Sequence, residues 1–379
     1  MPERSIIVIM KNRRSERLRF ALGDDCKFVY LSDLKFSKLQ RLLSKSGRVL
    51  ANRGSNESFY RLVAQQLARE FTDRKTVIVS LDNSNHLVAE FRRAGVTCPI
   101  LLVQHGANSV EYGSLDASTL SDSLLLCFGR REVSQYVLSG YRPEFAVPIG
   151  SLLNSHYIRN NPRIPVSQVE ARVCIMSEYR SDGDDQLDNY MIARQDSWDL
   201  LLESIRLLPR ILPLSLHVAL RPSDSGSGSA ADQIDYFRKR LGNELTFSVP
   251  NSPFSSHNAS DSSRVTLGLI STTLIESLGR GNKVIFSNPL ADNRLNSPLK
   301  GVCEHRGQNS RSLIDRIGEV HQIQLSDFES QVLPSVEHVI ERKVDAVDAV
   351  RSAIEILRVG NTSEDLATQL GPLLAKSET

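Results

Sequence analysis

Hydroxyl side chains gather where an apolar run ends in the second half of the sequence. The run 265–270 is followed directly by Ser271, Thr272 and Thr273, and then by a short stretch with helical spacing. Hydroxyl groups and free backbone N–H groups at a helix start attract anions, so this segment predicts a phosphate site. Thr273 and Glu276 also have the spacing of a capping box, in which Glu276 serves only the helix end.

A cation and two carboxylates follow another apolar run. Arg221 comes directly after the run 214–220, and Asp232 and Asp235 lie three residues apart near the start of a predicted helix. A guanidinium group matches a carboxylate or a phosphate in a two-pronged geometry. Either aspartate could act as a nucleophile or a base. Aspartate near a helix start also stabilises the helix dipole without any chemistry, so both interpretations stay open.

A histidine follows an apolar run in the first half of the sequence. The run 99–103 ends in Gln104, His105 and Gly106. Histidine exchanges a proton near neutral pH, and glycine lets a ligand approach the backbone closely, so this segment is a candidate for acid–base chemistry on a ligand. The alternative is a turn with a hydrogen-bonded structural histidine.

The run 172–176 is followed in the same way by Glu178 and Arg180. Ligands of doubly wound sheets lie beyond the carboxyl ends of the strands, so we expect both side chains to face the ligand. The alternative is that they form an ordinary ion pair at the surface, which would contribute little to stability or function.

The elements that must position these residues alternate along the chain. Short aliphatic runs without polar alternation are typical of strands buried on both faces, and stretches with helical apolar spacing lie between them. The runs are 6–10, 76–81, 99–103, 124–128, 172–176, 214–220, 265–270 and 283–286. Alternation of this kind predicts parallel sheets that are covered by helices.

Asparagine and proline interrupt the alternation at 155–168, which we interpret as a linker. We therefore predict an α/β protein with two Rossmann-like, doubly wound lobes that face a cleft. The first lobe is expected at residues 1–160, the second at 166–330, and a helical C-terminal tail at 331–379. The ligand is expected in the cleft, beyond the carboxyl ends of the strands.

Composition excludes several functional classes. The 46 basic and 44 acidic side chains leave a net charge of +2, so there is no broad positive field for nucleic acid. The five cysteines include no C-x-x-C pair, so neither a disulfide framework nor a structural zinc is expected. No apolar run approaches the ~20 residues of a membrane helix. We expect a cytoplasmic protein without metal or cofactor, whose membrane association, if it has one, is peripheral at the inner face.

Several of these segments resemble a group of bacterial surface-carbohydrate biosynthesis proteins with a GT-B-like glycosyltransferase architecture. The matching segments, which span both lobes, are 103–106, 127–129, 148–151, 175–180, 232–237 and 271–286. Within this group, the segments are similar to those of retaining β-Kdo transferases. These enzymes use CMP-Kdo, and the resemblance implies a reaction through a covalent sugar adduct on an aspartate. The resemblance implies a glycosyltransferase whose acceptor is a lipopolysaccharide, an O-antigen or a capsular glycan.

The resemblance also implies roles for individual residues. Asp232 would be the nucleophile, with Asp235 as the fallback. His105 would reach from the first lobe, on the acceptor side, as an acid, a base or an acceptor contact. Retention of configuration needs two successive inversions at the anomeric carbon, which a carboxylate nucleophile permits.

By the same resemblance, the second lobe would hold the nucleotide. Arg221, Lys283 and the helix start at 271–273 would meet the carboxylate and the single phosphate of CMP-Kdo, and Glu276 would contact the ribose. Two alternatives stay open. One is a transferase that uses CDP-glycerol or a UDP- or GDP-linked sugar, and the other is a non-catalytic two-lobed module that binds partners in polysaccharide assembly.

Overall fold

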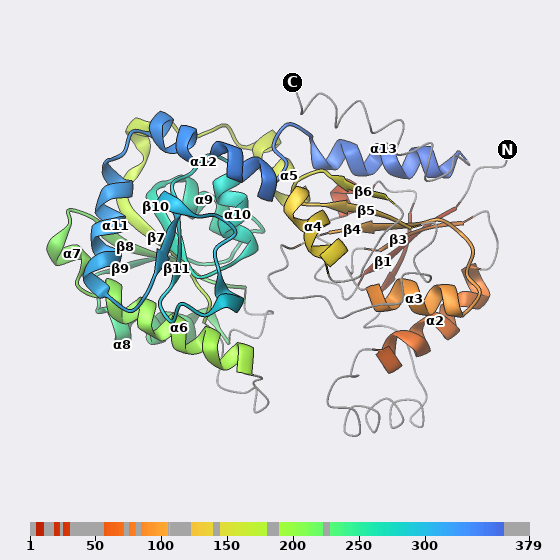
Figure 1. Ribbon diagram of the computed structural model, residues 1–379, viewed down its shortest axis with the longest axis horizontal. Coiled ribbons are helices and arrows are strands. Elements are labelled where there is room, and N and C mark those ends of the chain that lie inside the picture. The colour runs from red at the N-terminus through yellow and green to blue at the C-terminus, as the bar shows by residue number, and fades with distance from the viewer. Residues whose placement is uncertain are drawn as a thin grey trace. The chain divides into compact units, whose positions relative to one another are not determined.

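The computed structural model describes residues 5–10, 19–22, 26–30, 57–71, 76–80, 85–104, 106, 123–138, 145–179, 189–222 and 228–359. Contacts divide the chain into two compact units (Figure 1). Among the described residues, the first unit contains those up to 106, those at 123–155 and those at 340–359, and the second unit contains those at 156–339. Each unit is built on its own sheet.

The first unit has a parallel sheet with the strand order β2-β1-β3-β4-β5-β6. The strands are β1 (Ser5–Met10), β2 (Lys27–Tyr30), β3 (Thr76–Ser80), β4 (Ile100–Val103), β5 (Ser123–Cys127) and β6 (Phe145–Pro148). The helices are α2 (Glu57–Phe71), α3 (Asn85–Arg93), α4 (Arg130–Leu138), the start of α5 (Leu152–Asn160) and α13 (Ala346–Arg358). The central strands come from the aliphatic runs, and their residues Val8, Val79 and Leu126 are fully buried.

The segment interpreted as a linker, 155–168, is helical in its first part. α5 starts in the first unit and ends in the second, so the chain crosses between the units within a helix. On the second-unit side, Tyr157 is 3% exposed, and its hydroxyl donates a hydrogen bond of 2.8 Å to Asn258 Oδ1. Buried contacts of this kind stabilise the helix, although its sequence contains asparagines that are typical of a loop.

The second unit has a parallel sheet with the order β12-β11-β10-β7-β8-β9. The strands are β7 (Glu170–Met176), β8 (Ser215–Ala219), β9 (Leu245–Ser248), β10 (Ser263–Gly268), β11 (Val284–Asn288) and β12 (Glu304–Arg306). The helices are α6 (Asn189–Ile205), α7 (Leu208–Ile211), α8 (Ala230–Leu241), α9 (Ser255–Asp261), α10 (Thr272–Gly279), α11 (Ser310–Gln322) and α12 (Leu325–Val339).

The second sheet changes direction of growth at β7. The chain adds β8 and β9 on one side of β7, and then adds β10 on the other side. The strand order therefore reverses between β7 and β10, which we call the switch point.

The described part of the expected tail, 331–379, is divided between the two units. α12 belongs to the second unit, whereas α13 belongs to the first. Asp345 caps α13 by accepting hydrogen bonds from two backbone N–H groups of the first turn. The apolar face of α13 is buried, and the helix contacts β1 and β3. The predicted C-terminal helices are therefore present, and α13 contributes to the cover of the first sheet.

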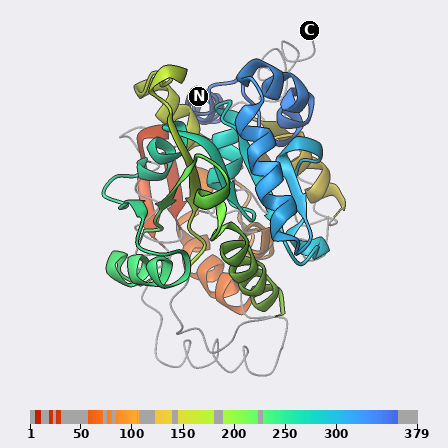
Figure 2. The ribbon, with the colours of Figure 1, turned by 90° about the vertical axis from the view of Figure 1, so that its left-hand side faces the viewer.

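Helices cover the second sheet as well. α6 carries Trp198, the single tryptophan of the sequence, which is 1% exposed. Its ring meets the ring of Phe237 from α8 edge-on, with the centroids 6.1 Å apart. α6 and α11 lie side by side against the sheet, as Figures 1 and 2 show. Because Trp198 lies in the core of the second unit, its fluorescence reports the unfolding of that unit.

Candidate functional site

The switch point of the second unit brings together residues from three elements. Glu178 follows β7, Ile270 and Ser271 lie between β10 and α10, and Arg194 comes from α6. Nε of Arg194 donates to Oε2 of Glu178 at 2.6 Å, and Nη2 donates to the same oxygen. Nη2 also donates to the Ile270 carbonyl at 3.3 Å. One guanidinium group therefore joins the ends of the two strands at the position where doubly wound sheets bind ligands.

The helix start beyond β10 has the features of an anion site. Ser271 is the N-cap of α10, and its Oγ accepts a hydrogen bond of 3.2 Å from the Leu274 N–H. Thr272 and Thr273 form the first helical positions and are half-buried. The N–H groups of a first turn have no partner within the helix, and the helix dipole adds positive potential there. The predicted phosphate site thus lies at the start of a capped helix of eight residues.

Glu276 does not serve the helix start, so the capping-box interpretation of Thr273 and Glu276 is wrong. The cap is Ser271, and the carboxylate of Glu276 lies in the interior, where Oε2 is 3.2 Å from Nε2 of His257. The side chain of Glu276 is 2% exposed and that of His257 4%. The structure gives Glu276 a buried partner on α9 and does not bring its carboxylate to the surface of the site.

Arg221 lies beside the switch point, at the end of β8. Its backbone N–H donates to Oε1 of Gln233 at 3.1 Å, and its carbonyl accepts from Nε2 of the same side chain at 2.9 Å. Gln233 is fully buried and also accepts a hydrogen bond of 3.2 Å from Oγ of Ser177, which follows β7. These bonds fix the backbone of Arg221 next to the residues that follow β7.

Asp232 takes part in the capping box at the start of α8. Its Oδ2 accepts from the N–H of Ser229 at 2.8 Å and from Oγ of Ser229 at 2.7 Å, and its own N–H donates to that Oγ at 3.1 Å. These hydrogen bonds hold the pKa of Asp232 below its ordinary value. Asp232 and Asp235 are both exposed on α8. The nucleophilic role of either aspartate stays a prediction.

Lys283 does not join the phosphate site. It precedes β11 and therefore lies at the amino ends of the strands, whereas Ser271 lies at the carboxyl ends. Its Nζ donates to the His321 carbonyl at 3.0 Å and to the Ile323 carbonyl. Burial, followed by the charge of Arg264, lowers its pKa. Lys283 stabilises the C-terminal end of α11, where carbonyl groups lack helical partners.

We expect Lys283→Met to lower the free energy of unfolding of the second unit by about 1–2 kcal/mol, because two partly buried carbonyl groups lose their donor. Nucleotide binding should not change. Urea unfolding followed by Trp198 fluorescence measures the first effect, and calorimetric titration measures the second. Lys300→Met, at an exposed lysine of the same unit, is the matched control and should alter neither. Weaker nucleotide binding by Lys283→Met alone would return Lys283 to the site.

In the first unit, Gln104 has a structural role. It is 1% exposed, and its Nε2 donates to the Gly106 carbonyl at 2.9 Å and to Oε2 of Glu132 at 3.1 Å. Its Oε1 accepts from the Phe128 N–H at 2.9 Å. The amide therefore links the end of β4 to the residue after β5 and to α4. His105 lies outside the described residues.

Arg180, the remaining predicted residue, also lies outside the described residues. The residue that sequence reasoning missed is Arg194, which occupies a helix and follows no strand. Within the described residues, no three histidine, cysteine, aspartate or glutamate side chains come together in a way that could hold a metal ion. In the same part of the chain, no helix is both long and apolar enough to cross a membrane.

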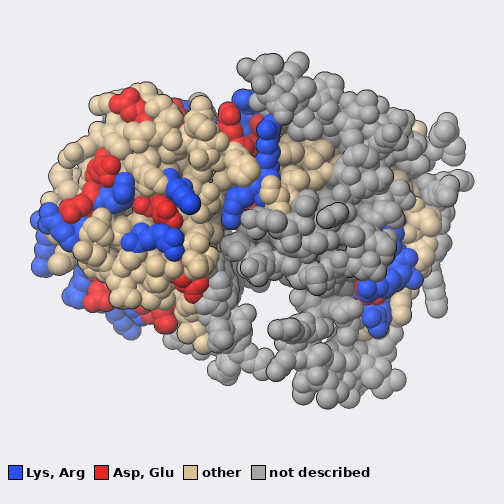
Figure 3. Space-filling model, viewed as in Figure 1, with Lys and Arg blue, Asp and Glu red and all other residues tan. Residues whose placement is uncertain are grey.

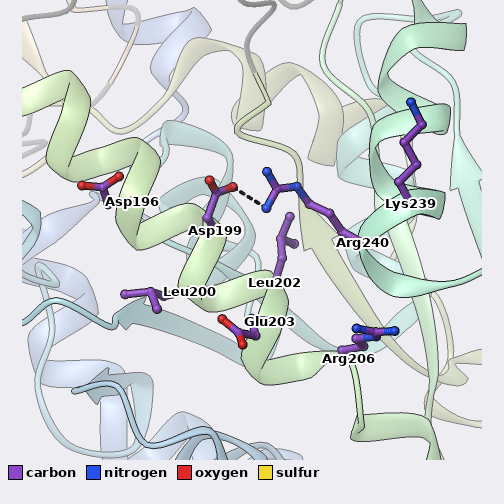
Figure 4. A pocket seen from close by; sticks show the side chains of 8 residues that line it. All are labelled: Asp196, Asp199, Leu200, Leu202, Glu203, Arg206, Lys239 and Arg240. Atoms are coloured by element: carbon purple, nitrogen blue, oxygen red, sulfur yellow. Dashed lines mark ion pairs between the residues drawn. The ribbon is translucent and has the colours of Figure 1, made fainter.

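A pocket of about 580 Å³ lies between α6 and α8 (Figure 4). Its lining is Asp196, Asp199, Leu200, Leu202, Glu203, Arg206, Lys239 and Arg240. Asp199 and Arg240 point toward one another and form an ion pair of 3.0 Å. Acidic and basic side chains line this pocket equally, so it has no preference for phosphate. On the face shown in Figure 3, both signs are likewise intermixed over the second unit.

No protein-family model matches the sequence, and no curated protein matches it. Solved structures match over almost the whole chain. A glycosyltransferase from Rickettsia africae is 12% identical, with a TM-score of 0.52, and the match covers 94% of this chain and 98% of that chain. A putative UDP-N-acetylglucosamine 2-epimerase from Listeria monocytogenes is 10% identical, with a TM-score of 0.57 and coverage of 95% and 97%. The chain has a GT-B-like fold.

The two parallel sheets and the similarity to these structures confirm the predicted architecture of two doubly wound lobes. A UDP-GlcNAc 2-epimerase from Neisseria meningitidis, solved with UDP-GlcNAc bound, is 10% identical, with a TM-score of 0.50 and coverage of 93% and 98%. At such identities the similarity establishes the GT-B-like fold and no specific family. Glycosyltransferases and UDP-GlcNAc 2-epimerases share this fold.

Proposed function

We propose that this chain is an enzyme that uses a nucleotide-linked sugar, and specifically a glycosyltransferase. The observation that carries the proposal is the contact of Arg194 with both sides of the switch point, through Glu178 after β7 and the Ile270 carbonyl before α10. This contact places an arginine and a helix start where doubly wound sheets bind nucleotides. The GT-B-like fold, which glycosyltransferases and UDP-GlcNAc 2-epimerases share, supports the same proposal.

In this proposal the phosphate of the nucleotide binds at the start of α10. Backbone N–H groups of the first turn and the hydroxyl groups of Thr272 and Thr273 donate to it. During transfer, the bond between the anomeric carbon and the phosphate oxygen breaks, and negative charge grows on the phosphate. Donors that the capped helix already holds in place stabilise this charge without rearrangement.

CMP-Kdo is the donor that we propose. It brings a phosphate and, beside the anomeric carbon, a carboxylate, for which Arg221 is positioned by Gln233. Asp232, the neighbour of Gln233, is the proposed nucleophile, because it supplies a carboxylate at the start of α8. Its carboxylate attacks the anomeric carbon as CMP leaves. A hydroxyl group of a lipopolysaccharide or capsular acceptor then attacks the anomeric carbon, the ester bond to the aspartate breaks and releases the carboxylate, and the proton of the hydroxyl passes to water.

A panel of nucleotides and nucleotide sugars tests the proposal with the full chain. CMP and CMP-Kdo at 100 times their Kd should stabilise the second unit by about 2.7 kcal/mol, which raises its Tm by about 5–10 °C. Isothermal titration with the same ligands gives the Kd. A response to CDP-glycerol, or to UDP- or GDP-linked sugars alone, would replace the proposed donor and keep the enzyme class. No response to any member of the panel would favour the non-catalytic module.

A further inference from the structure

Glu178 has a carboxylate oxygen that accepts no hydrogen bond from the residues that the structure describes. The residue is 6% exposed, and its Oε1 is buried without a hydrogen-bond partner within the described part of the chain. Buried carboxylates normally have both oxygens bonded, because an acceptor removed from water and given no donor costs free energy. Such an oxygen at a candidate site therefore indicates a donor that arrives with a ligand.

Arg194 orients this carboxylate without using Oε1. Its hydrogen bonds to Glu178, from Nε and from Nη2, both go to Oε2. Nη2 donates in addition to the carbonyl of Ile270, the residue before the N-cap of α10. The ion pair thus fixes the direction of the carboxylate, and the same guanidinium group contacts the residue before the N-cap of α10.

An anion and a carboxylate repel one another, so Oε1 is not a phosphate contact. It can accept a hydrogen bond only from an O–H or N–H group. We propose that Glu178 Oε1 accepts a hydrogen bond from a neutral hydroxyl or amino group of the ligand whose phosphate binds at the start of α10. This inference rests on the proposed function and adds a requirement to it. The ligand is a phosphate ester that carries such a donor close to the phosphate, either on its nucleoside or on the transferred sugar.

Glu178→Gln tests this role with little change in shape. Arg194 offers only donors, so the amide oxygen of the glutamine must take the place of Oε2. The amide NH2 group then takes the place of Oε1. It is a hydrogen-bond donor itself, so it cannot accept the hydrogen bond that the ligand donates to Oε1. Loss of a hydrogen bond to a charged group, with two donors opposed, should weaken binding by about 10- to 100-fold.

The matched control is Glu90→Gln in the first unit. Glu90 is also a buried glutamate, 3% exposed, and it pairs with Arg93 and, at 3.4 Å, with Arg61. The control therefore removes the charge of a buried, arginine-paired glutamate that belongs to the other unit. We expect Glu90→Gln to leave every Kd unchanged. Trp198 fluorescence and thermal unfolding confirm that both variants retain the folded second unit.

The probes are CMP, CMP-Kdo, UDP, UDP-GlcNAc and inorganic phosphate, titrated into the wild-type chain and both variants. Glu178→Gln should not weaken the binding of inorganic phosphate, because phosphate carries neither the nucleoside nor the sugar that would supply the donor. If Glu178→Gln binds both the nucleotide and its sugar conjugate more weakly than the wild type does, the donor is on the nucleoside. If it binds only the conjugate more weakly, the donor is on the sugar. A second measurement needs no variant. If the donor is the ribose 2′-hydroxyl, deoxycytidine monophosphate should bind the wild type more weakly than CMP.

Equal binding by the wild type and Glu178→Gln, for ligands that do bind, would overturn the inference and leave the proposed function standing. Failure of the wild type to bind any nucleotide or nucleotide sugar would overturn the proposed function, and this inference with it. If Glu178→Gln fails to fold, unchanged binding of the deoxy analogue would exclude the ribose 2′-hydroxyl as the donor, and equal binding of the nucleotide and its conjugate to the wild type would count against the sugar.

Discussion

Replacing Asp232 with asparagine is expected to slow sugar transfer by on the order of 10³-fold or more, with the fold retained. An amide cannot form the glycosyl ester that double displacement requires. The amide oxygen of asparagine still accepts from the N–H and Oγ of Ser229, so α8 keeps its cap. The measurement is the rate of Kdo transfer from CMP-Kdo to a lipopolysaccharide acceptor, together with mass spectrometry of the wild type for a covalent sugar adduct.

Two substitutions control this result. Asp345→Asn changes another aspartate at a helix start, the N-cap of α13 in the first unit, and should leave transfer unchanged. Asp235→Asn changes the neighbouring exposed carboxylate on α8 and should have a small effect. A fully active Asp232→Asn would exclude Asp232 as the nucleophile. If Asp235→Asn were the inactive variant, the role would pass to Asp235.

Arg194→Met is expected to lower the free energy of unfolding of the second unit by about 3–5 kcal/mol. Methionine retains the apolar part of the side chain and removes the charge and the donors. The carboxylate of Glu178, whose side chain is 3% exposed, would then be buried without a counter-charge. Trp198 lies one turn further along α6, so urea unfolding followed by its fluorescence measures this loss directly.

The double variant Arg194→Met/Glu178→Met separates the loss of the pair from the burial of a lone charge. An apolar pair of similar volume often replaces a buried ion pair at little cost, so the double variant should recover most of the stability. Arg93→Met in the first unit leaves Glu90 with Arg61 and should not shift the Trp198 transition. A loss below about 1 kcal/mol for the single variant would mean that water already screens Glu178.

The central strands of both sheets could be predicted from the sequence, because a strand buried on both faces leaves an unbroken aliphatic run. β4 and β10 are examples. The four strands that were not predicted, β2, β6, β9 and β12, are the edge strands of the two sheets. β12 is only Glu304–Arg306, and β9 is largely half-exposed. β2, β9 and β12 are partly solvated and have no apolar run of more than three residues, which is why they escaped prediction. β6 is apolar, but it has only four residues and ends in a proline.

The candidate site could be predicted only in part. Ser271 and Arg221 follow strands and therefore lie at the carboxyl ends, as expected. Lys283 precedes its strand, so attention to strand direction would have excluded it. Arg194 could not be predicted, because an arginine on a helix is normally exposed and nothing in its separation of 16 residues from Glu178 indicates contact. The fold alone brings the two together.

The most direct test of the account is a crystal structure of the full chain with CMP bound. The account predicts that the phosphate lies within hydrogen-bond distance of the backbone N–H groups of Thr272 and Thr273, at the switch point between β7 and β10. A nucleotide bound elsewhere, for example in the pocket between α6 and α8, would contradict the central claim.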